Sequence, residues 1–360
     1  MAKEKLVSII LPCYNAADYI DEALESLINQ SYKYLEIIAI DDYSIDDTWV
    51  KLQKAAQKHK NIHIFKNEKN LKLIKTLNKA IDLCNGEYIA RMDSDDISDI
   101  ARIEKQMKII TDNEDIDLVS VFPKMIDSQG NYHSGQKFFQ ATTTGSAKFI
   151  ALFQAPILHA GILIKKSILK KERYLQHLEY QHIEDYELWI RLLYERSIEL
   201  KVIPEILYSY RINLSSVSYE HRDAQLLNLR KHSQKTIAKY YNVEISDGTV
   251  EVMLNHRCGD VNLVDFRRAI YSLKKIKLLY IKNNIDVLKK EDIREIHCWV
   301  QQRIIKICIT SIVDDKFSLK VNAVYHLFLQ LDSLLYLITY RNALNRTIWE
   351  FRKISYKFKV

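Results

Sequence analysis

The chain has 360 residues, a length that suggests two or three domains. Hydrophobic residues make up 48% of the chain and charged residues 28%, which excludes wholesale disorder. With only seven glycines, the chain lacks the glycine-rich motifs of P-loop and dinucleotide-binding sites. The formal net charge of +7 leaves anionic partners open.

The cysteines indicate a reducing compartment. The chain has five of them, an odd number, and no two are spaced as C-x-x-C. This pattern argues against a disulfide scaffold and against a cysteine zinc site. The first residues contain too short an apolar run for a signal peptide, and no stretch predicts a transmembrane helix. We therefore expect a cytoplasmic protein, peripheral at most on the inner face of the cytoplasmic membrane.

The first hundred residues alternate short β-branched runs with helical periods. This alternation is typical of βαβ units around a mostly parallel sheet, in which ligands bind beyond the carboxyl ends of the strands. The predicted strands are 6–11, 36–40, 62–65 and 87–92, and the predicted helices are 20–28, 48–58 and 71–83.

The next hundred residues give a mixed pattern, and after about residue 220 long helical periods replace the strand signals. A domain boundary is predicted near 215–225, where 213–218 is serine-rich. The predicted elements between these points are a helix at 98–113, strands at 118–126 and 160–164, a helix at 184–196, and two short extended pieces around Pro204 within 198–211.

Acidic residues follow the predicted strand at 87–92, in the run Asp93-Ser94-Asp95-Asp96. Three carboxylates in four residues repel one another, and a divalent cation that prefers oxygen ligands, such as Mg²⁺ or Mn²⁺, offsets that repulsion. Such a cation also neutralises a diphosphate leaving group. The alternative is a solvated acidic turn that caps the helix predicted from Ser98.

Two further acidic groups stand where a ligand could reach them. Asp42 follows the second predicted strand and could accept an N–H from a nucleobase, whereas Asp46 and Asp47 read as helix caps. Glu184 and Asp185 begin a predicted helix. They either compensate its dipole or place a general base at the site.

Five segments, taken in order, resemble the family 2 glycosyltransferases. The resemblance covers about residues 5–212. The five segments are 7–15 (VSIILPCYN), 40–47 (IDDYSIDD), 70–96, 102–106 (RIEKQ) and 184–192. The third segment contains the D-x-D order of 93–95, and the last contains the acidic pair Glu184-Asp185.

The resemblance implies a fold and a division into domains. The fold is the α/β GT-A nucleotide-diphospho-sugar transferase fold, Rossmann-like with a mostly parallel central sheet, followed by a helical C-terminal region. Residues 1–218 form the catalytic domain, with a nucleotide-sugar half at about 1–97 and an acceptor half at about 98–218. Residues 219–360 form a helical domain with a basic aromatic tail.

The resemblance also assigns the donor site. Asp42 matches the residue that reads the base, and the pocket that it lines is shared with Pro12 and Tyr14. Tyr14 stacks on the base in this interpretation, and a core tyrosine is the alternative. The D-x-D pair implies Mn²⁺ or Mg²⁺ as cofactor. It also assigns three more residues to the nucleotide-sugar site. Asp93 is directed toward the ribose or the metal, Asp95 is a metal ligand, and Ser94 lies between them.

The catalytic base implied by the resemblance is Asp185, which would take the proton of the acceptor hydroxyl. His159 and Glu184 fall where the family places residues near the acceptor, although His159 also reads as a core histidine. Trp189 and Arg191 read as packing and helix-surface residues.

Two residues depart from the family pattern, because Tyr43 and Lys72 stand where the family usually has glycine. Tyrosine and lysine adopt a positive φ at a higher cost than glycine does. We therefore expect the loop around the base pocket to be rebuilt. Lys72 is expected to be a solvated helix lysine rather than a phosphate ligand.

The predicted function is a metal-dependent, inverting glycosyltransferase. Its donor is a nucleotide-diphosphate sugar, by preference a UDP-sugar. Its acceptor is a hydroxyl of a cell-surface glycan precursor of the capsule, O-antigen or lipopolysaccharide type. The last 21 residues carry six basic residues and one acid, interleaved with aromatic residues, which fits contact with an anionic membrane.

Three other interpretations have less support. A phosphatase using Asp93 and Asp95 leaves Asp42 and Asp185 unexplained. A degenerate transferase that acts as a scaffold at the membrane surface fits Tyr43 and Lys72 but not the intact acidic residues. Nucleic-acid binding rests only on the net charge and on the basic tail, and no nucleic-acid partner is expected.

Overall fold

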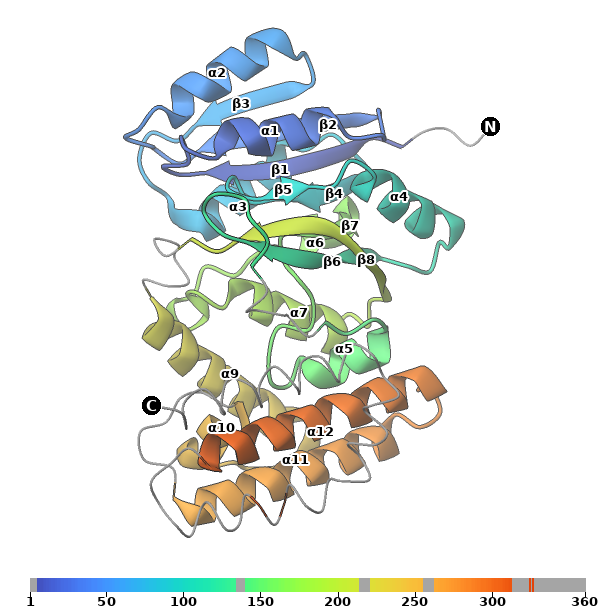
Figure 1. The fold of residues 1–360 in the computed structure, drawn as a ribbon. Helices are drawn as coiled ribbons and strands as arrows, with labels where there is room; N and C mark the ends of the chain where they lie inside the picture. The colour runs from blue at the N-terminus through green and yellow to red at the C-terminus, as the bar shows by residue number, and fades with distance from the viewer. Residues whose placement is uncertain are drawn as a thin grey trace. The chain divides into compact units, whose positions relative to one another are not determined.

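The computed structural model describes residues 5–133, 140–213, 221–254 and 262–312, with residues 324 and 326. The chain divides into two compact units (Figure 1). The first contains Met1–Ala147 and Ala155–Gln225, and the second contains Lys148–Gln154 and Leu226–Val360. Each unit is described by itself.

The first unit is built on one twisted sheet of eight strands in the order β3-β2-β1-β4-β7-β6-β8-β5 (Figure 1). β7 and β5 run antiparallel to their neighbours, and the other six share one direction. The strands are β1 (Val7–Cys13), β2 (Leu35–Asp41), β3 (Ile62–Lys66), β4 (Tyr88–Arg91), β5 (Ile97–Ser98), β6 (Leu118–Ile126), β7 (Leu163–Lys165) and β8 (Leu200–Arg211).

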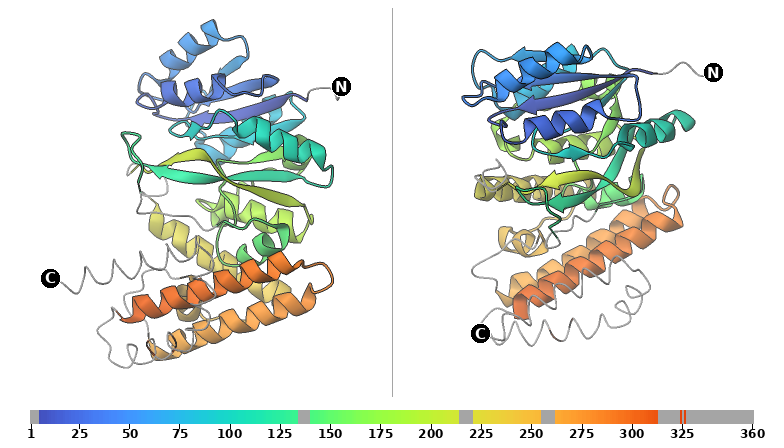
Figure 2. Two further views of the ribbon diagram at one scale, coloured as in Figure 1. Left: turned by 45° about the vertical axis from the view of Figure 1, so that its right-hand side comes forward. Right: turned by 45° about the horizontal axis from the view of Figure 1, so that its top comes forward.

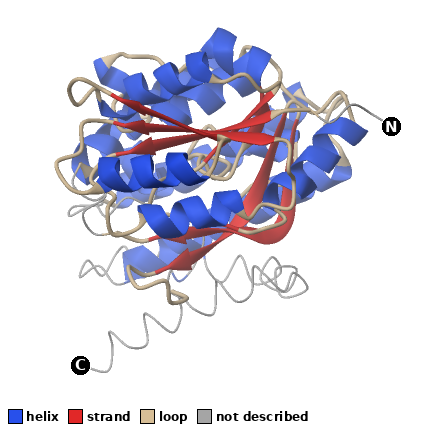
Figure 3. Ribbon diagram, turned by 90° about the horizontal axis from the view of Figure 1, so that it is seen from above, coloured by secondary structure: helices blue, strands red, loops and turns tan. Residues whose placement is uncertain are grey.

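Helices cover both faces of this sheet (Figure 3). Right-handed crossovers place the helices that follow β1 and β2 on one face, and the helix between β3 and β4 on the other. The predicted α/β architecture is therefore confirmed. The helices are α1 (Ile20–Ile28), α2 (Thr48–Lys58), α3 (Lys72–Leu83), α4 (Arg102–Asp112), α5 (Thr144–Ile150), α6 (Lys166–Glu172) and α7 (Glu184–Tyr194), with a short 3₁₀ turn at Leu178–Tyr180.

The central strand β1 contains a proline, Pro12, near its end. All seven residues of β1 are buried. β1 pairs with β2 along its whole length, but its register with β4 ends at Ile10 opposite Arg91. Pro12 lies beyond that point, so its missing N–H removes no bond to β4. The two strands part here, at the position where the strand order reverses and where doubly wound sheets bind ligands.

The motif at 102–106 lies in helix α4 and binds the backbone of the sheet through its side chains. Arg102 is fully buried, and its Nη1 donates to the carbonyl of Arg91 at 3.1 Å. Gln106 Nε2 donates to the carbonyls of Val119 and Gly161 at 2.9 and 2.8 Å. These bonds tie the backbones of β4 and β6 to helix α4.

Several predicted boundaries are wrong. Ile97 and Ser98 do not begin a helix but form β5, antiparallel to β8, and α4 starts at Arg102. The Asp99 carboxylate accepts the N–H of Ala101, and the Asp99 carbonyl accepts that of Arg102. Because of this turn, α4 begins at Arg102 instead of Ser98.

The extended pieces around Pro204 form one strand, β8, instead of two. Its parallel register with β6 shifts near Phe122, and this irregularity absorbs the proline. The strand expected at 160–164 is shorter and starts later, at Leu163. Helices α5 and α6 were not predicted.

The second unit is helical, as predicted for this part of the chain. Phe149 and Phe153 belong to it, since their rings pack against Trp299 at 5.8 and 5.0 Å. Helices α11 and α12 lie side by side (Figures 1 and 2). The helices are α9 (Arg222–Tyr241), which begins in the first unit, α10 (Asp247–Leu254), α11 (Leu263–Asn283) and α12 (Lys290–Ile312).

Two sequence predictions fall outside the described residues. The first is the basic aromatic tail at 340–360. The second is the domain boundary predicted near 215–225, of which residues 215–220 are not described. In the described part of the chain, no helix is both long enough and apolar enough to span a membrane.

Tyr43 and Lys72 both have the left-handed backbone that glycine favours, so neither position avoids the conformation whose cost led us to expect a rebuilt loop. The φ angle is 67° at Tyr43 and 68° at Lys72. Both side chains are exposed, so packing contributes little to offset the cost of this conformation. The expected identity of Lys72 as an exposed helix lysine is also confirmed.

This geometry predicts that Lys72→Gly stabilises the fold. Glycine removes the left-handed cost of about 1 kcal/mol or more, which exceeds its entropic cost in the unfolded chain. We expect the free energy of unfolding to rise by about 0.5 kcal/mol. Urea denaturation measures it.

The matched control is Lys75→Gly, an exposed lysine one turn later in the same helix. Its φ is not positive, so glycine there is expected to destabilise the fold by about 1 kcal/mol. The same sign of effect for both substitutions would contradict the assignment of strain to position 72.

Candidate functional site

The carboxyl ends of the parallel strands bring the predicted site residues to one edge of the sheet. Because β1, β2 and β4 run in one direction, the residues that follow them leave the sheet at the same edge. Tyr14 follows β1, Asp42 follows β2, and Asp93 follows β4 by two residues.

Asp42 is buried and organises the loops at the end of β2. Its Oδ1 accepts the side-chain amide of Asn67 at 2.8 Å and the backbone N–H of Leu71 at 2.7 Å. Neither bond uses Oδ2, which keeps its acceptor capacity for a ligand. Asn67 is in turn held by Thr76 and Lys79. Asp42 therefore fixes the loop after β3 and offers one carboxylate oxygen.

Asp46 joins the loops after β1 and β2. Its carboxylate accepts the N–H of Ala17 at 2.9 Å and both the N–H and the hydroxyl of Thr48. These bonds lower the pKa of Asp46, although burial opposes them as the largest single effect. The expected cap at Asp47 makes no side-chain bond.

Two aromatic side chains are exposed on these joined loops. Tyr14 is 50% exposed and Tyr43 is 48% exposed, so Tyr14 is not a core tyrosine. Asn15 links their loops, since its N–H donates to Ser44 and its side chain accepts from Ile45. Pro12 is buried within β1. Tyr14 presents a ring on which a planar base could stack.

The side chain of Arg91 is buried at the end of β4 and binds Asp93 through two bonds. Its Nη1 and Nη2 donate to the two Asp93 oxygens at 3.0 and 2.6 Å. The Asp93 N–H also donates to the Tyr208 hydroxyl at 3.3 Å. Asp93 is thus held in one orientation, with 29% of its side chain exposed.

Arg211, the last residue of β8, holds the rest of the acidic run. Its Nε donates to the carbonyl of Asp95 at 2.6 Å, and its N–H donates to the Asp96 carboxylate at 2.7 Å. Its Nη2 donates to Glu22 of α1 at 2.6 Å. Asp96 also accepts from Tyr208, so Asp96 is structural and does not cap a helix.

The Asp95 carboxyl differs from its neighbours, because Arg211 binds only its backbone. Burial, and then the nearby Asp93 charge, raise its pKa to about 6. A carboxylate that is costly to ionise in this way is stabilised by a bound cation. No group of three or more His, Cys, Asp or Glu side chains that could hold a metal occurs among the described residues. A metal at Asp95 would need ligands from a substrate.

The acidic pair at the start of α7 lies within electrostatic reach of the D-x-D run. Burial, and then Asp185, raise the pKa of Glu184 to about 7, while Arg91 lowers it and Asp93 raises it. Burial also raises the pKa of Asp185, against a bond from the N–H of Tyr186 and the charge of Arg91. The structure therefore brings together two sets of acids that are 90 residues apart in the sequence.

His159 is buried beside this group of acids. Its Nε2 lies 2.6 Å from the Tyr174 hydroxyl, and its ring stands edge-on to Trp189. Burial, and then the Arg91 charge, hold the pKa of His159 well below its usual range, so the imidazole is neutral. The predicted contact of His159 with an acceptor stays a prediction.

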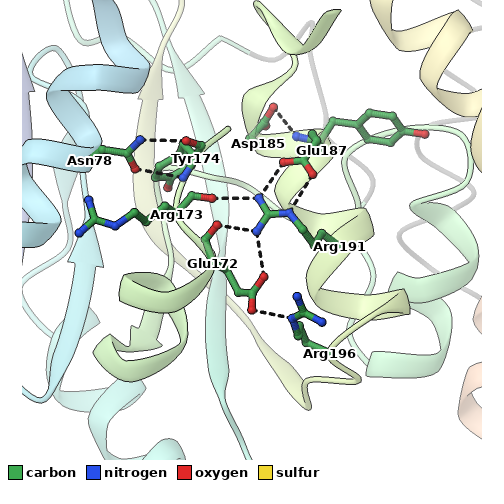
Figure 4. A network of polar contacts seen from close by, with 9 residues as sticks. Asn78, Glu172, Arg173, Tyr174, Asp185, Glu187, Arg191 and Arg196 are labelled. Atoms are coloured by element: carbon green, nitrogen blue, oxygen red, sulfur yellow. Dashed lines mark hydrogen bonds and ion pairs between the residues drawn. The ribbon is translucent and has the colours of Figure 1, made fainter. Parts of the chain in front are cut away.

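The expectation that Arg191 is a helix-surface residue is wrong, because its side chain anchors α7 through a network of polar contacts (Figure 4). Its guanidinium binds the carboxylates of Glu187 and Glu172 and the carbonyls of Glu172 and Arg173 at 2.6 to 3.0 Å. The next residue, Tyr174, exchanges two bonds with Asn78 of α3. Through these contacts α7 is tied to the segment after α6, which carries Tyr174, the partner of His159. Trp189 is buried, as expected of a packing residue.

Several residues of the site escaped the sequence analysis. Arg91 stands two residues before Asp93, and a buried arginine next to acids at a strand end is a signal that could have found it. Arg211 and Tyr208 had no local signal, because their partners lie more than 110 residues away. Tyr174 was also missed, and its partner Asn78 lies 96 residues away.

Comparison with known proteins decides the family. Residues 8–172 match the family model described as Glycosyl transferase family 2. An uncharacterized glycosyltransferase of Haemophilus influenzae is 30% identical over 311 residues, which span 79% of this chain and 96% of that protein. The chain belongs to glycosyl transferase family 2.

Other similar proteins include an Escherichia coli glucosyltransferase and a protein of known structure. An Escherichia coli protein named UDP-Glc:alpha-D-GlcNAc-diphosphoundecaprenol beta-1,3-glucosyltransferase is 31% identical over 216 residues, or 59% of this chain and 80% of that protein. Staphylococcus aureus TarS in complex with UDP has a similar fold, with a TM-score of 0.51 and 17% identity, over 85% of this chain and 80% of that one.

Membership of the family makes this protein a glycosyltransferase with the GT-A fold, as the resemblance implied. The interpretations as a phosphatase and as a nucleic-acid-binding protein have no support among these relatives. The roles given to individual side chains stay predictions.

The raised pKa of Glu184 predicts a pH-dependent stability for this glycosyltransferase. The folded pKa, about 7, lies above the ordinary value of 4.5, so the folded state binds more protons between these pH values. Stability therefore falls as pH rises from about 4.5 to 7. Glu184→Gln removes this loss and should raise the free energy of unfolding at pH 8 by about 1–3 kcal/mol.

Thermal unfolding from pH 4 to pH 8 measures the effect, and the difference between the two proteins should vanish at about pH 4. The control is Glu114→Gln, an exposed glutamate, which should follow the wild type at every pH. A difference between Glu184→Gln and the wild type that does not change with pH would contradict the prediction.

Proposed function

We propose that this protein transfers a sugar from a UDP-sugar, with inversion, to a hydroxyl of a lipid-linked cell-surface glycan precursor, with the help of Mn²⁺ or Mg²⁺. The observation that carries the proposal is the grouping of Asp42, Asp93, Asp95 and Asp185 at one edge of the sheet. A nucleotide-sugar needs contacts to a base, to a diphosphate and to the reacting carbon, and these residues supply all three kinds.

The donor would bind along the edge from Asp42 to Asp95. The free Oδ2 of Asp42 accepts an N–H of the base, and Tyr14 stacks on it. Asp93, oriented by Arg91, accepts a ribose hydroxyl. Support for UDP comes from the UDP-Glc donor named for the Escherichia coli relative and from the UDP complex of TarS.

The charge balance favours a divalent cation at Asp95. Five acidic side chains, Asp93, Asp95, Asp96, Glu184 and Asp185, stand near three buried arginines in the described part of the chain, Arg91, Arg102 and Arg211, and burial raises the pKa of Asp95. Mg²⁺ and Mn²⁺ are commonly held by one or two carboxylates together with substrate phosphates. Asp95 fits this role, and Asp93 fits it less well because Arg91 occupies both of its oxygens. When bound, the cation neutralises charge on the leaving diphosphate.

Asp185 would act as the general base. Its raised pKa makes the ionised carboxylate more basic than an ordinary aspartate, which favours proton abstraction. It takes the proton of the acceptor hydroxyl while that oxygen attacks the anomeric carbon opposite the diphosphate. One such displacement inverts the anomeric centre. Glu184 and the segment around His159 and Tyr174 stand on the acceptor side.

The acceptor class is proposed from the relatives. The Escherichia coli relative is named for a diphosphoundecaprenol-linked acceptor. A lipid-linked precursor of the capsule, O-antigen or lipopolysaccharide type carries the hydroxyl and the anionic linkage that such an enzyme meets.

Asp185→Asn tests this mechanism. The substitution keeps the shape of the side chain but removes the base, so we expect transfer to fall by about 10²–10⁴-fold with UDP affinity within about threefold of wild type. Sugar transfer from labelled UDP-sugars to a lipid-diphosphate-linked acceptor measures the rate, and calorimetry with UDP measures the affinity.

Asp112→Asn, at an exposed aspartate that ends α4, is the matched control and should keep wild-type transfer. Transfer by Asp185→Asn within tenfold of the control would place the base elsewhere.

A further inference from the structure

Helix α11 exposes a line of apolar side chains in the second unit. Val264, Tyr271 and Leu278 are 55%, 66% and 65% exposed, and Ile285, just beyond the helix, is 54% exposed. Each follows the previous one by seven residues, which is close to two turns of helix. The three side chains within the helix, Val264, Tyr271 and Leu278, therefore follow one another along a single face of α11.

A row of basic residues shares this face. Arg268, Lys275 and Lys282 are exposed, and each stands four residues after a member of the apolar line. Residues four apart are neighbours on a helix surface, so apolar and basic side chains alternate along it. The one acid of α11, Asp265, is bonded instead to Asn262 and Thr249.

The opposite face of α11 is already covered. Phe266, Ala269, Ile270, Leu273, Ile276 and Tyr280 are buried, and α11 contacts both α10 and α12 (Figure 2). The helix is therefore fixed by its own apolar face. The apolar side chains of the outer face are not needed for that core, and among the described residues they remain accessible.

We propose that the outer face of α11, consisting of Val264, Arg268, Tyr271, Lys275, Leu278 and Lys282, binds the surface of an anionic membrane. Basic residues contact lipid phosphates, and apolar residues next to them enter the region between headgroups and acyl chains. A tyrosine among them suits this boundary, because its ring is apolar and its hydroxyl is polar.

The alternation favours a membrane over the other partners of a basic surface. Nucleic acid would use the cations but would gain nothing from Val264 and Leu278. A second copy of the helix would place like charges opposite one another, and the tail at 341–360 carries five net positive charges, which repel the same row. An anionic bilayer complements both kinds of side chain.

The experiment uses the full chain and sedimentation with vesicles. We expect the wild type to bind vesicles of phosphatidylcholine with 30% phosphatidylglycerol and to bind pure phosphatidylcholine vesicles weakly. Each basic residue near an anionic surface raises the partition coefficient about fivefold. The triple variant Arg268→Gln, Lys275→Gln, Lys282→Gln should therefore bind about a hundredfold more weakly and depend less on salt.

A second variant, Tyr271→Ser with Leu278→Ser, tests the apolar part. It should lower vesicle binding but leave the salt dependence unchanged, because it removes no charge. Circular dichroism and gel filtration establish that each variant is folded and show whether its oligomeric state has changed.

The matched control removes three exposed lysines of the first unit, Lys54→Gln, Lys58→Gln and Lys60→Gln, and so makes the same change in net charge. It should keep at least a third of the wild-type partition coefficient. Equal losses in the control and in the α11 triple variant would overturn the proposal, as would vesicle binding unaffected by either α11 variant. A third outcome would assign the face to nucleic acid and overturn the proposal. In that outcome the protein does not bind vesicles, and its binding to duplex DNA is weakened by the triple charge variant but not by Tyr271→Ser with Leu278→Ser.

Discussion

The site depends on one buried charge, the guanidinium of Arg91. It lies at the end of β4 and binds both oxygens of Asp93, and its charge partly offsets the rise that burial causes in the pKa of Glu184 and Asp185 at the start of α7. A buried cation among carboxylates is stable only because they surround it, and the carboxylates can be gathered only because it is there. Acids from distant parts of the chain therefore share one edge of the sheet.

Three other sets of polar contacts hold the loops and helices around this edge of the sheet. Asp42 and Asn67 hold the loops on the base side, and Arg211 ties the acidic run to α1 and β8. Arg191 fixes α7 against the segment that ends in Tyr174 (Figure 4). The carboxylates of Asp42, Asp93 and Asp96 each accept a described hydrogen bond, whereas burial raises the pKa values of the Asp95 and Glu184 carboxyls. This imbalance is the physical basis for expecting a cation with the donor.

Local patterns in the sequence predicted much of this fold but little of its support. β-branched runs revealed the parallel strands, and the acids at their ends revealed Asp42, Asp93 and Asp95, because both signals are short-range. The two-residue strand β5 has no period, and the register shift that absorbs Pro204 depends on a partner strand 80 residues away. Arg211 bonds Glu22 across 189 residues, so no window of sequence contains that pair. The left-handed backbone at Tyr43 and Lys72 was not predicted, because the cost of a positive φ for these side chains led us to expect a rebuilt loop instead.

The central claim is that this edge binds a nucleoside diphosphate through a cation held at Asp95. The most direct measurement is the shift in melting temperature caused by UDP, with and without Mn²⁺, in the wild type and in Asp95→Ala. A ligand at a hundred times its Kd stabilises the folded state by about 2.7 kcal/mol. The account predicts a clear rise with UDP and Mn²⁺ together, a smaller rise with UDP alone, and loss of the Mn²⁺-dependent part in Asp95→Ala. An equal rise in both proteins, or no rise in the folded wild type, would contradict it.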